Sequence, residues 1–253
     1  MKYINDFTPR GVKMTLDAPW ITIKITGCTR FEGKYSVSRH SDKAREVLLD
    51  AAEELFALHG IDAVSNRKIT EHAGTANHSA IKYHFGSRAD LLRAMVQRAV
   101  GDVYAIREKL PLNSDVSALN LREQVTLYTL PLVYSFDALP KPSWRAKFLF
   151  QALLRPDLTD VLAGLVDEDF RGKDFPRRLP PELEGLPDVV ISARAKILGL
   201  MLLGLCAEYE DSVNEGEQLG TWESVGYFLI DSVVGMMAAP STSPADFMDF
   251  SQR

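Results

Sequence analysis

The segment TANHSAIKYHFGSR, residues 75–88, concentrates hydrogen-bonding side chains in a stretch that Gly74 and Gly86 keep short. At 100° per residue, residues 77–85 separate into two arcs of a helix. The arc expected to face neighbouring helices is mostly apolar and consists of Asn77, Ala80, Ile81, His84 and Phe85. The opposite arc is polar and consists of His78, Ser79, Lys82 and Tyr83. Each of these four side chains can bond a phosphate oxygen or the edge of a nucleic-acid base.

The histidines offer a second kind of chemistry, metal binding, which their spacing disfavours. His72, His78 and His84 recur every six residues, whereas ligands on one helix face recur every three or four. A glycine turn also separates the first of them from the other two. The two cysteines, Cys28 and Cys206, are far apart and fit no zinc spacing. We therefore expect no metal and no other cofactor.

A helical pattern precedes this segment and is expected to support it. Residues 41–60, SDKAREVLLDAAEELFALHG, place apolar side chains at i, i+4, i+7 and i+8, beginning at Leu48. Ser41 is the expected N-cap of this helix, and Gly60 is its expected end. One face of the helix is therefore expected in a core.

Two further helices are expected to frame the segment. Residues 65–74, SNRKITEHAG, form a short helix that Ser65 can cap. Ser87 and Asp90 have the spacing of a capping box, and they begin a long helix that runs to about Leu110. A short helix that follows another short helix across a glycine turn is the helix-turn-helix arrangement.

At this point the residues resemble a known family. The sequence AREVLLDAAEELFALHGIDAVSNRKITEHAG, followed by SAIKYHFGSRADLL, resembles the N-terminal DNA-binding domain of the TetR family of transcriptional regulators over residues 42–96. One departure is that eight residues, TANHSAIK, separate Gly74 from Tyr83, where many members have seven. The turn is therefore expected to be longer by one residue, with Asn77 as the N-cap of the recognition helix.

The resemblance implies a role in DNA binding for specific residues. It places Ser65, Arg67, Tyr83, Ser87 and Arg88 on the phosphate backbone, the last two at a helix N-terminus that favours anions. It places His78, Ser79 and Lys82 in the major groove, with His78 and Ser79 nearest the bases. His84 matches a histidine of the same element, although the wheel directs it towards the core. The implied set, with a basic arm before the first helix, is Arg39, His40, Lys43, Ser65, Arg67, Asn77, His78, Ser79, Lys82, Tyr83, His84, Ser87 and Arg88.

Charge is distributed unevenly along the 253 residues, whose formal net charge is −5. Residues 1–38 hold 6 basic and 3 acidic residues, residues 39–98 hold 9 and 8, and residues 99–253 hold 14 and 23. A nucleic-acid surface is therefore expected early in the chain, since the last part would repel a polyanion. The most apolar window, Ile197–Cys206, has about half the length of a bilayer span. We expect a cytoplasmic protein that does not contact a membrane.

These patterns divide the chain into four parts. Residues 1–40 lack a helical period, although residues 20–27 alternate like a short strand, and we expect a poorly ordered extension. Residues 41–87 are the expected helix-turn-helix domain, and residues 88–240 the expected effector-binding and dimerisation domain. Residues 241–253 are the expected frayed tail. The expected fold class is all-α, with a three-helix DNA-binding domain joined by a long helix to a helical C-terminal domain.

The C-terminal part is expected to be a bundle of apolar helices. Residues 117–136, 142–154, 189–213 and 222–240 read as helices, and the proline-rich residues 171–188 as a loop. The resemblance implies that the last two helices form a homodimer interface, in which we expect Leu202 and Val233. The small residues Gly199, Gly204 and Gly235 would allow close approach of these helices. The other possibility is that the two helices form only the core of their own domain.

The resemblance also implies a pocket for an unknown small-molecule effector, apolar or aromatic in character. Its candidate lining residues are large and mostly aromatic: Tyr128, Tyr134, Phe136, Trp144, Phe148, Met201 and Trp222. Aromatic residues at helical spacing also occur in ordinary cores.

Two hypotheses about the function therefore remain, and they belong to different classes. The first is a sequence-specific DNA-binding regulator, a repressor released from a palindromic operator by its effector. The alternative is a helical-bundle enzyme, or a ligand-binding protein without a DNA-binding role. An enzyme is disfavoured because the C-terminal part lacks clustered histidines, cysteines or paired carboxylates.

Overall fold

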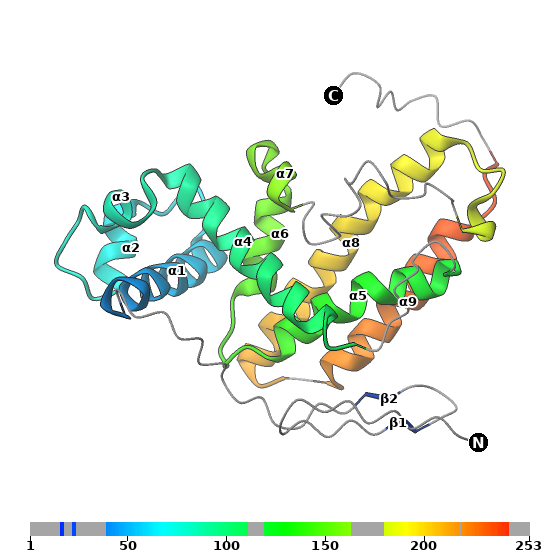
Figure 1. The fold of residues 1–253 in the computed structure, drawn as a ribbon, viewed down its shortest axis with the longest axis horizontal. Helices are drawn as coiled ribbons and strands as arrows, with labels where there is room; N and C mark the ends of the chain where they lie inside the picture. Colours follow the sequence, from blue (N-terminus) through cyan, green and yellow to red (C-terminus); the bar gives the residue numbers. More distant parts are fainter. Residues whose placement is uncertain are drawn as a thin grey trace. The chain divides into compact units, whose positions relative to one another are not determined.

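Helices form most of the regular structure in the part of the chain that the computed structural model describes (Figure 1). The described residues are 16–17, 22–23, 39–110, 119–162, 180–217 and 219–242. The chain divides into two compact units, Met1–Ser41 and Asp42–Arg253.

The first unit contains a short antiparallel ladder. In it β1 (Leu16–Asp17) pairs with β2 (Thr22–Ile23), and Leu16 lies opposite Ile23. The alternating residues 20–27 thus contain β2, and β1 supplies the partner that the sequence did not reveal. Apart from these strands and the start of the first helix, the expected extension lies outside the described residues, so its poor order stays a prediction.

Four helices form the N-terminal part of the second unit. They are α1 (Arg39–His59), which starts in the first unit, α2 (Asn66–His72), α3 (Ala80–Phe85) and α4 (Arg88–Arg107). α1 begins two residues before the expected N-cap, Ser41. Gly60 follows its end with φ +91°, a left-handed conformation that favours glycine. The apolar face of α1 is fully buried, as its period predicts: Leu48, Leu49, Ala52, Leu55 and Phe56.

The described residues of the C-terminal part form five more α-helices and two short 3-10 turns. They are α5 (Leu121–Asp137), α6 (Arg145–Leu153), η2 (Pro156–Leu158), α7 (Thr159–Leu162), η5 (Pro181–Leu183), α8 (Asp188–Glu215) and α9 (Trp222–Ala238). α5 packs along α9, and α6 packs along α8 (Figure 1). The expected frayed tail after residue 242 and most of the expected loop 171–188 lie outside the described residues.

One large core joins the helix-turn-helix to the C-terminal helices. It runs from Leu48 on α1 to Leu229 on α9, and a smaller cluster around Val233 and Leu183 lies near the end of α9. The expected fold class is thereby confirmed: an N-terminal helix-turn-helix is joined by the long α4 to a helical C-terminal region.

The expectation that Val233 lies in a dimer interface was wrong, and two of the glycines face a helix of the same chain. Val233 is 1 % exposed and belongs to the smaller core cluster of its own chain, so it is not available to a second subunit. A Cβ on Gly199 or Gly204 would lie 3.5 Å from Leu153 and 3.4 Å from Phe150, both on α6. Both positions therefore face α6 of the same chain, at distances that would be ordinary van der Waals contacts for a Cβ.

The surface of α8 is largely apolar and largely uncovered. α8 is long and apolar enough to cross a membrane, by length and composition alone, and only 22 % of its most apolar window of 18 residues is buried. The ten-residue window Ile197–Cys206 underestimated the length of the apolar segment in this helix. Among the described residues, the large apolar side chains of α8 that remain exposed are Ile197 and Leu200.

The start of α6 is capped by a side chain from α8. Glu210 is fully buried, and its carboxylate accepts hydrogen bonds from Ser143 Oγ at 3.0 Å, Ala146 N at 3.2 Å and Lys147 N at 3.0 Å. The residue at the N-cap position of α6, Trp144, makes no side-chain cap bond. Glu210 therefore satisfies the free N–H groups that every helix start exposes.

Glu210 is expected to give the protein a pH-dependent stability. Burial raises the pKa of Glu210, and the three hydrogen bonds only partly oppose this. The folded state then binds more protons than the unfolded state, so the free energy of unfolding falls as pH rises from the usual carboxyl pKa of about 4.3 through the raised pKa. Glu210→Gln removes this dependence.

Thermal unfolding of the Glu210→Gln variant at several pH values measures this effect. Its melting temperature relative to the unsubstituted protein should increase as pH rises above about 4.3. Glu208→Gln, at an exposed position of the same helix, is the control and should show no such trend. A difference for Glu210→Gln that does not change with pH would contradict the expectation.

Candidate nucleic-acid interface

Local hydrogen bonds fix the turn between α2 and α3. Ser65 caps α2, since its Oγ accepts from Lys68 N at 3.2 Å. Gly74 ends the helix with φ +67°. The Oδ1 of Asn77 accepts from Ser79 N at 2.9 Å, and the Asn77 carbonyl accepts from Ala80 N at 3.0 Å. The chain therefore makes a closed turn directly before α3.

The recognition helix is shorter than its sequence predicts. We expected a helix over residues 77–85 with Asn77 as its N-cap, but α3 spans Ala80–Phe85 and Ser79 holds the N-cap position without a side-chain cap bond. An asparagine side chain that bonds to backbone two residues ahead stabilises a turn in place of a helix. The additional residue of this chain is thus accommodated in the turn, and His78 lies in that turn.

The burial of α3 separates its two faces. Ala80 and Ile81 are buried in the main core, as the helical wheel predicts, whereas Asn77 is exposed and was wrongly assigned to the inner arc. His84 and Phe85 are half-buried. The outer face is polar and exposed: His78, Ser79, Lys82 and Tyr83.

Tyr83 is the most prominent side chain of α3. It is 77 % exposed, and its ring meets the ring of His84 edge-on with centroids 4.9 Å apart. His84 is thus placed as a support for Tyr83. The guanidinium of Arg45 on α1 lies 5.0 Å from the Phe85 ring centroid and closes the other side of the helix.

His78 and Ser79 lie on the turn that leads into α3. His78 Nδ1 is 3.5 Å from Thr70 Oγ1 on α2, a contact at the limit of hydrogen bonding, and the rest of its ring is exposed. The exposed Ser79 precedes the first helical residue. Both side chains are therefore accessible to a ligand that approaches the start of α3.

Cations on α2 and α1 extend the interface. Arg67 forms an exposed ion pair with Glu71 at 2.7 Å, and this hydrogen bond raises the pKa of Arg67 and lowers that of Glu71. Exposed ion pairs contribute little to stability, so a phosphate can replace the carboxylate. Lys68 and Lys43 are exposed as well. The sequence reasoning missed Lys68, although its position beside Arg67 at the start of α2 indicates it.

Most acidic groups of α1 and the following loop are paired with cations from other parts of the chain. Arg98 on α4 bonds to Glu46 at 3.3 Å, Asp50 at 2.6 Å and Glu53 at 2.7 Å. The loop residue Asp62 pairs with Arg155 at 2.7 Å. These pairs offset the negative charge that would otherwise weaken an interface for a polyanion.

The start of α4 forms the remaining corner of the interface. Ser87 caps the helix reciprocally with Asp90: Asp90 N donates to Ser87 Oγ at 3.1 Å, and Ser87 Oγ donates to Asp90 Oδ2 at 2.6 Å. Ser87 is exposed. The carboxylate of Asp90 competes here with any bound phosphate. Arg39 is the first residue of α1, but its side chain and that of His40 lie outside the described residues.

The geometry gives Arg88 a different role from the predicted phosphate contact. Its guanidinium donates to the carbonyl of Ile61 and, at 3.1 Å, to Asn66 Oδ1, and it lies 4.9 Å from the Phe56 ring centroid. Burial lowers the pKa of Arg88. Arg88 therefore fastens α4 to the loop between α1 and α2.

Removal of the Arg88 side chain should destabilise the domain. We expect Arg88→Ala to lower the free energy of unfolding by about 1–3 kcal/mol, because the Ile61 carbonyl loses its side-chain donor and the contact with Phe56 is lost. Urea unfolding measures this change. The control is Arg67→Ala, at an exposed ion pair, which should leave the free energy of unfolding nearly unchanged. Equal effects of the two substitutions would contradict the assignment of Arg88.

The residues proposed to line an effector pocket differ in burial and lie in different parts of the described structure. Phe136, Phe148 and Trp222 are fully buried in the main core, and Met201 packs against the smaller cluster. The Tyr134 hydroxyl lies 3.4 Å from a carboxylate oxygen of Glu223, and burial raises the pKa of this phenol. Tyr128 and Trp144 are half-buried.

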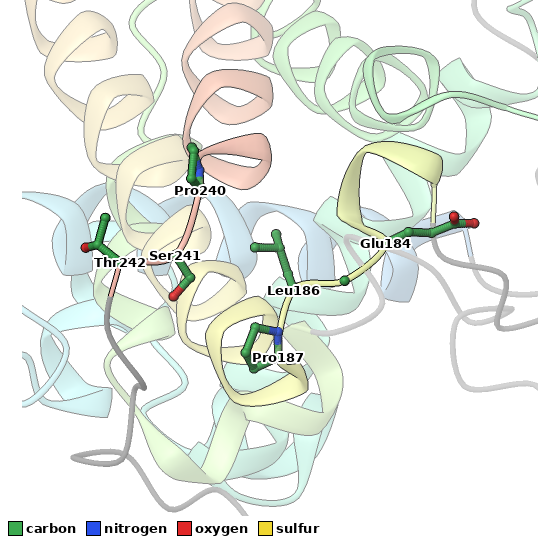
Figure 2. Close-up of a pocket in the computed structure, with 7 residues that line it drawn as sticks. Glu184, Leu186, Pro187, Pro240, Ser241 and Thr242 are labelled. Carbon is green, nitrogen blue, oxygen red and sulfur yellow. The ribbon is translucent and has the colours of Figure 1, made fainter.

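A cavity of about 590 Å³ lies elsewhere, at the ends of α8 and α9. Figure 2 shows the two segments that line it: Glu184–Pro187 precede α8, and Pro240–Thr242 follow α9. None of the predicted lining residues is among them.

Comparisons with known proteins identify the N-terminal region. Residues 48–95 match the family model described as bacterial regulatory proteins, tetR family. These residues run from the buried face of α1 to the first turns of α4 and include the whole turn and α3. The chain has no match among curated proteins.

Several solved structures resemble the chain at low sequence identity. A TetR family transcription regulator from Marinobacter aquaeolei VT8 is 18% identical, with 78% of this chain and 97% of that chain covered and a TM-score of 0.48. A TetR-like transcriptional regulator from Rhodococcus sp. RHA1 is 16% identical, with 78% of this chain and 97% of that chain covered and a TM-score of 0.46. NalD, the secondary repressor of the MexAB-OprM multidrug efflux pump in Pseudomonas aeruginosa, is 22% identical, with 77% of this chain and 95% of that chain covered and a TM-score of 0.44.

Proposed function

We propose, since the chain belongs through residues 48–95 to the tetR family of bacterial regulatory proteins, that it binds a specific DNA operator as a homodimer. The observation that carries this proposal is the division of the α3 region. Ala80 and Ile81 hold the helix in the core, while the exposed side chains of Lys82 and Tyr83 project from it. The exposed His78 and Ser79 lie on the turn directly before it. Such groups bond phosphates and base edges in a major groove.

Each side chain has a separate part in the proposed complex. Five side chains hold phosphates and so set the register of the protein on the duplex. They are Ser65, Arg67, Lys68, Lys82 and Tyr83. His78 and Ser79 read base edges at the start of α3. The N-terminal cation Lys43, with Arg39 before it, extends the contact along the backbone.

The proposed dimer uses the uncovered faces of α8 and α9. Ile197 and Leu200 on α8 are 51 % and 45 % exposed, and Phe228 and Tyr227 on α9 are 61 % and 37 % exposed. Large apolar side chains that cluster on neighbouring helices mark an interaction surface. A two-fold dimer would then present two copies of α3 to a palindromic operator with half-sites about one helical turn apart.

We further propose that the protein is a cytoplasmic repressor that a small apolar molecule releases from DNA. The apolar composition of α5, α8 and α9 supports an apolar effector. Binding of the effector would favour a conformation in which the two α3 helices no longer fit one operator. The protein needs no catalytic group for this function.

Titration of the protein against the intergenic DNA upstream of its own gene tests the proposed function. A discrete complex that persists in a large excess of unrelated duplex would support it. If unrelated duplex competes for the protein as well as the unlabelled intergenic fragment does, sequence-specific binding at that site is contradicted. If the protein binds none of the added DNA even at low salt, any role in DNA binding is contradicted.

A further inference from the structure

One face of α6 is seated on α1 and on the loop that follows it. Phe148 stacks on Phe56 with ring centroids 6.2 Å apart. Gln151 donates to the Ala57 carbonyl at 3.2 Å and accepts from Ile61 N at 3.2 Å. The contacts recur every three or four residues along the helix, as expected for a single face.

Arg145, in the first turn of this face, joins three helices. Its Nε donates to Glu53 Oε2 on α1 at 2.6 Å, and its Nη1 donates to Asp102 Oδ2 on α4 at 2.8 Å. The same Glu53 oxygen accepts from Arg98 on α4 at 2.7 Å. Arg145 and Glu53 are only 5 % and 7 % exposed. α1, α4 and α6 thus share one buried ionic cluster.

The opposite side of α6 is fixed to α8. Glu210 of α8 caps the α6 N–H groups of Ala146 and Lys147, and Lys147 pairs with Asp211 at 2.6 Å. Arg145 directly precedes the two capped residues in sequence, and its side chain reaches α1 and α4. A short path of bonds connects α8 to α1 through two neighbouring residues of α6.

We propose that Arg145 is a positioning residue that sets the angle between the DNA-binding helices and α8. Buried ion pairs add little net stability compared with apolar packing, but their directional bonds can select one arrangement among several. The bonds to Glu53 and Asp102 fix α1 and α4 relative to α6, and Glu210 fixes α6 relative to α8. Because α8 carries the proposed dimer surface, Arg145 sets the separation of the two α3 helices. This inference rests on the proposed function.

The dependence of DNA affinity on half-site spacing measures this role. The probe is the duplex that the unsubstituted protein selects from a random library, together with duplexes whose half-sites are one or two base pairs closer or farther apart. The unsubstituted protein should bind the altered duplexes about 100-fold more weakly, since each added pair displaces and rotates one half-site. In Arg145→Met, whose Glu53 keeps its bond to Arg98, this ratio should fall to less than about tenfold because the helix-turn-helix can adapt.

Two further variants make the result decisive. Arg122→Met removes an exposed ion pair between α5 and α9, which lies outside this path, and should keep the steep dependence on spacing. Arg145→Lys retains a cation beside Glu53 but cannot reach Asp102 at the same time, so it should fold and show a flattened dependence even if Arg145→Met does not fold. An unchanged spacing ratio in a folded Arg145 variant, with or without a uniform loss of affinity, would overturn the proposal. If the unsubstituted protein selects no duplex, the proposed function itself fails.

Discussion

Phe228→Arg is expected to convert the protein into a monomer that binds its operator at least about 100-fold more weakly. Phe228 is 61 % exposed in the single chain, so arginine at this position is compatible with the fold of one protomer. In the proposed dimer the same arginine would be a buried charge without a partner, which costs several kcal/mol. A monomer also loses the gain in affinity that two linked half-site contacts provide.

Sedimentation of the variant and titration of the operator measure both consequences. Leu154→Arg is the matched control, because it places the same charge at a 64 % exposed apolar residue just after α6. The control should remain dimeric and bind as the unsubstituted protein does. An unchanged dimer for Phe228→Arg would remove this part of α9 from the interface.

Substitutions around α3 are expected to separate the residues that hold phosphate from the residues that read bases. Lys82→Ala and Tyr83→Phe should weaken binding by a similar factor on every operator variant, because phosphate contacts carry no sequence information. Lys82→Ala should also reduce the slope of log affinity against log salt by about 1 per subunit, since one counterion fewer is released. His78→Ala or Ser79→Ala should cost about 1–3 kcal/mol on the best site and less on others.

A panel of operators with single-base changes decides between these roles. Lys109→Ala, at an exposed lysine beyond the end of α4, is the control for loss of a positive charge and should leave the salt slope unchanged. Uniform losses for the His78 and Ser79 variants, together with selective losses for Tyr83→Phe, would show that α3 is rotated on the DNA relative to the proposed arrangement.

The helix boundaries set by local chemistry were largely predictable from the sequence. Ser65 and Ser87 cap α2 and α4 as expected, and Gly60 follows the end of α1. These signals act over three or four residues, so periodicity and cap residues reveal them. The error at Asn77 arose within the same range, because an asparagine stabilises either a helix start or a turn, and the sequence alone does not distinguish the two.

Features that depend on distant parts of the chain were not predictable. Arg88 looked like a phosphate ligand, but its donors are used by the carbonyl of Ile61, 27 residues away, and by Asn66. Arg145 did not stand out in the sequence, although it joins three helices. The helical spacing of Phe148 fits a pocket as well as a core, and that of Val233 fits an interface as well as a core. Only the packing of the whole chain assigns both residues to the core.

Selection of DNA from a random library by the unsubstituted protein tests the central claim most directly. The account predicts enrichment of an inverted repeat whose half-sites are about one helical turn apart, with centres separated by about 10 base pairs. The same selection with Ser79→Ala should relax one or two positions in each half-site. A pool that remains as diverse as the starting library would contradict the claim that α3 and its neighbours read DNA sequence.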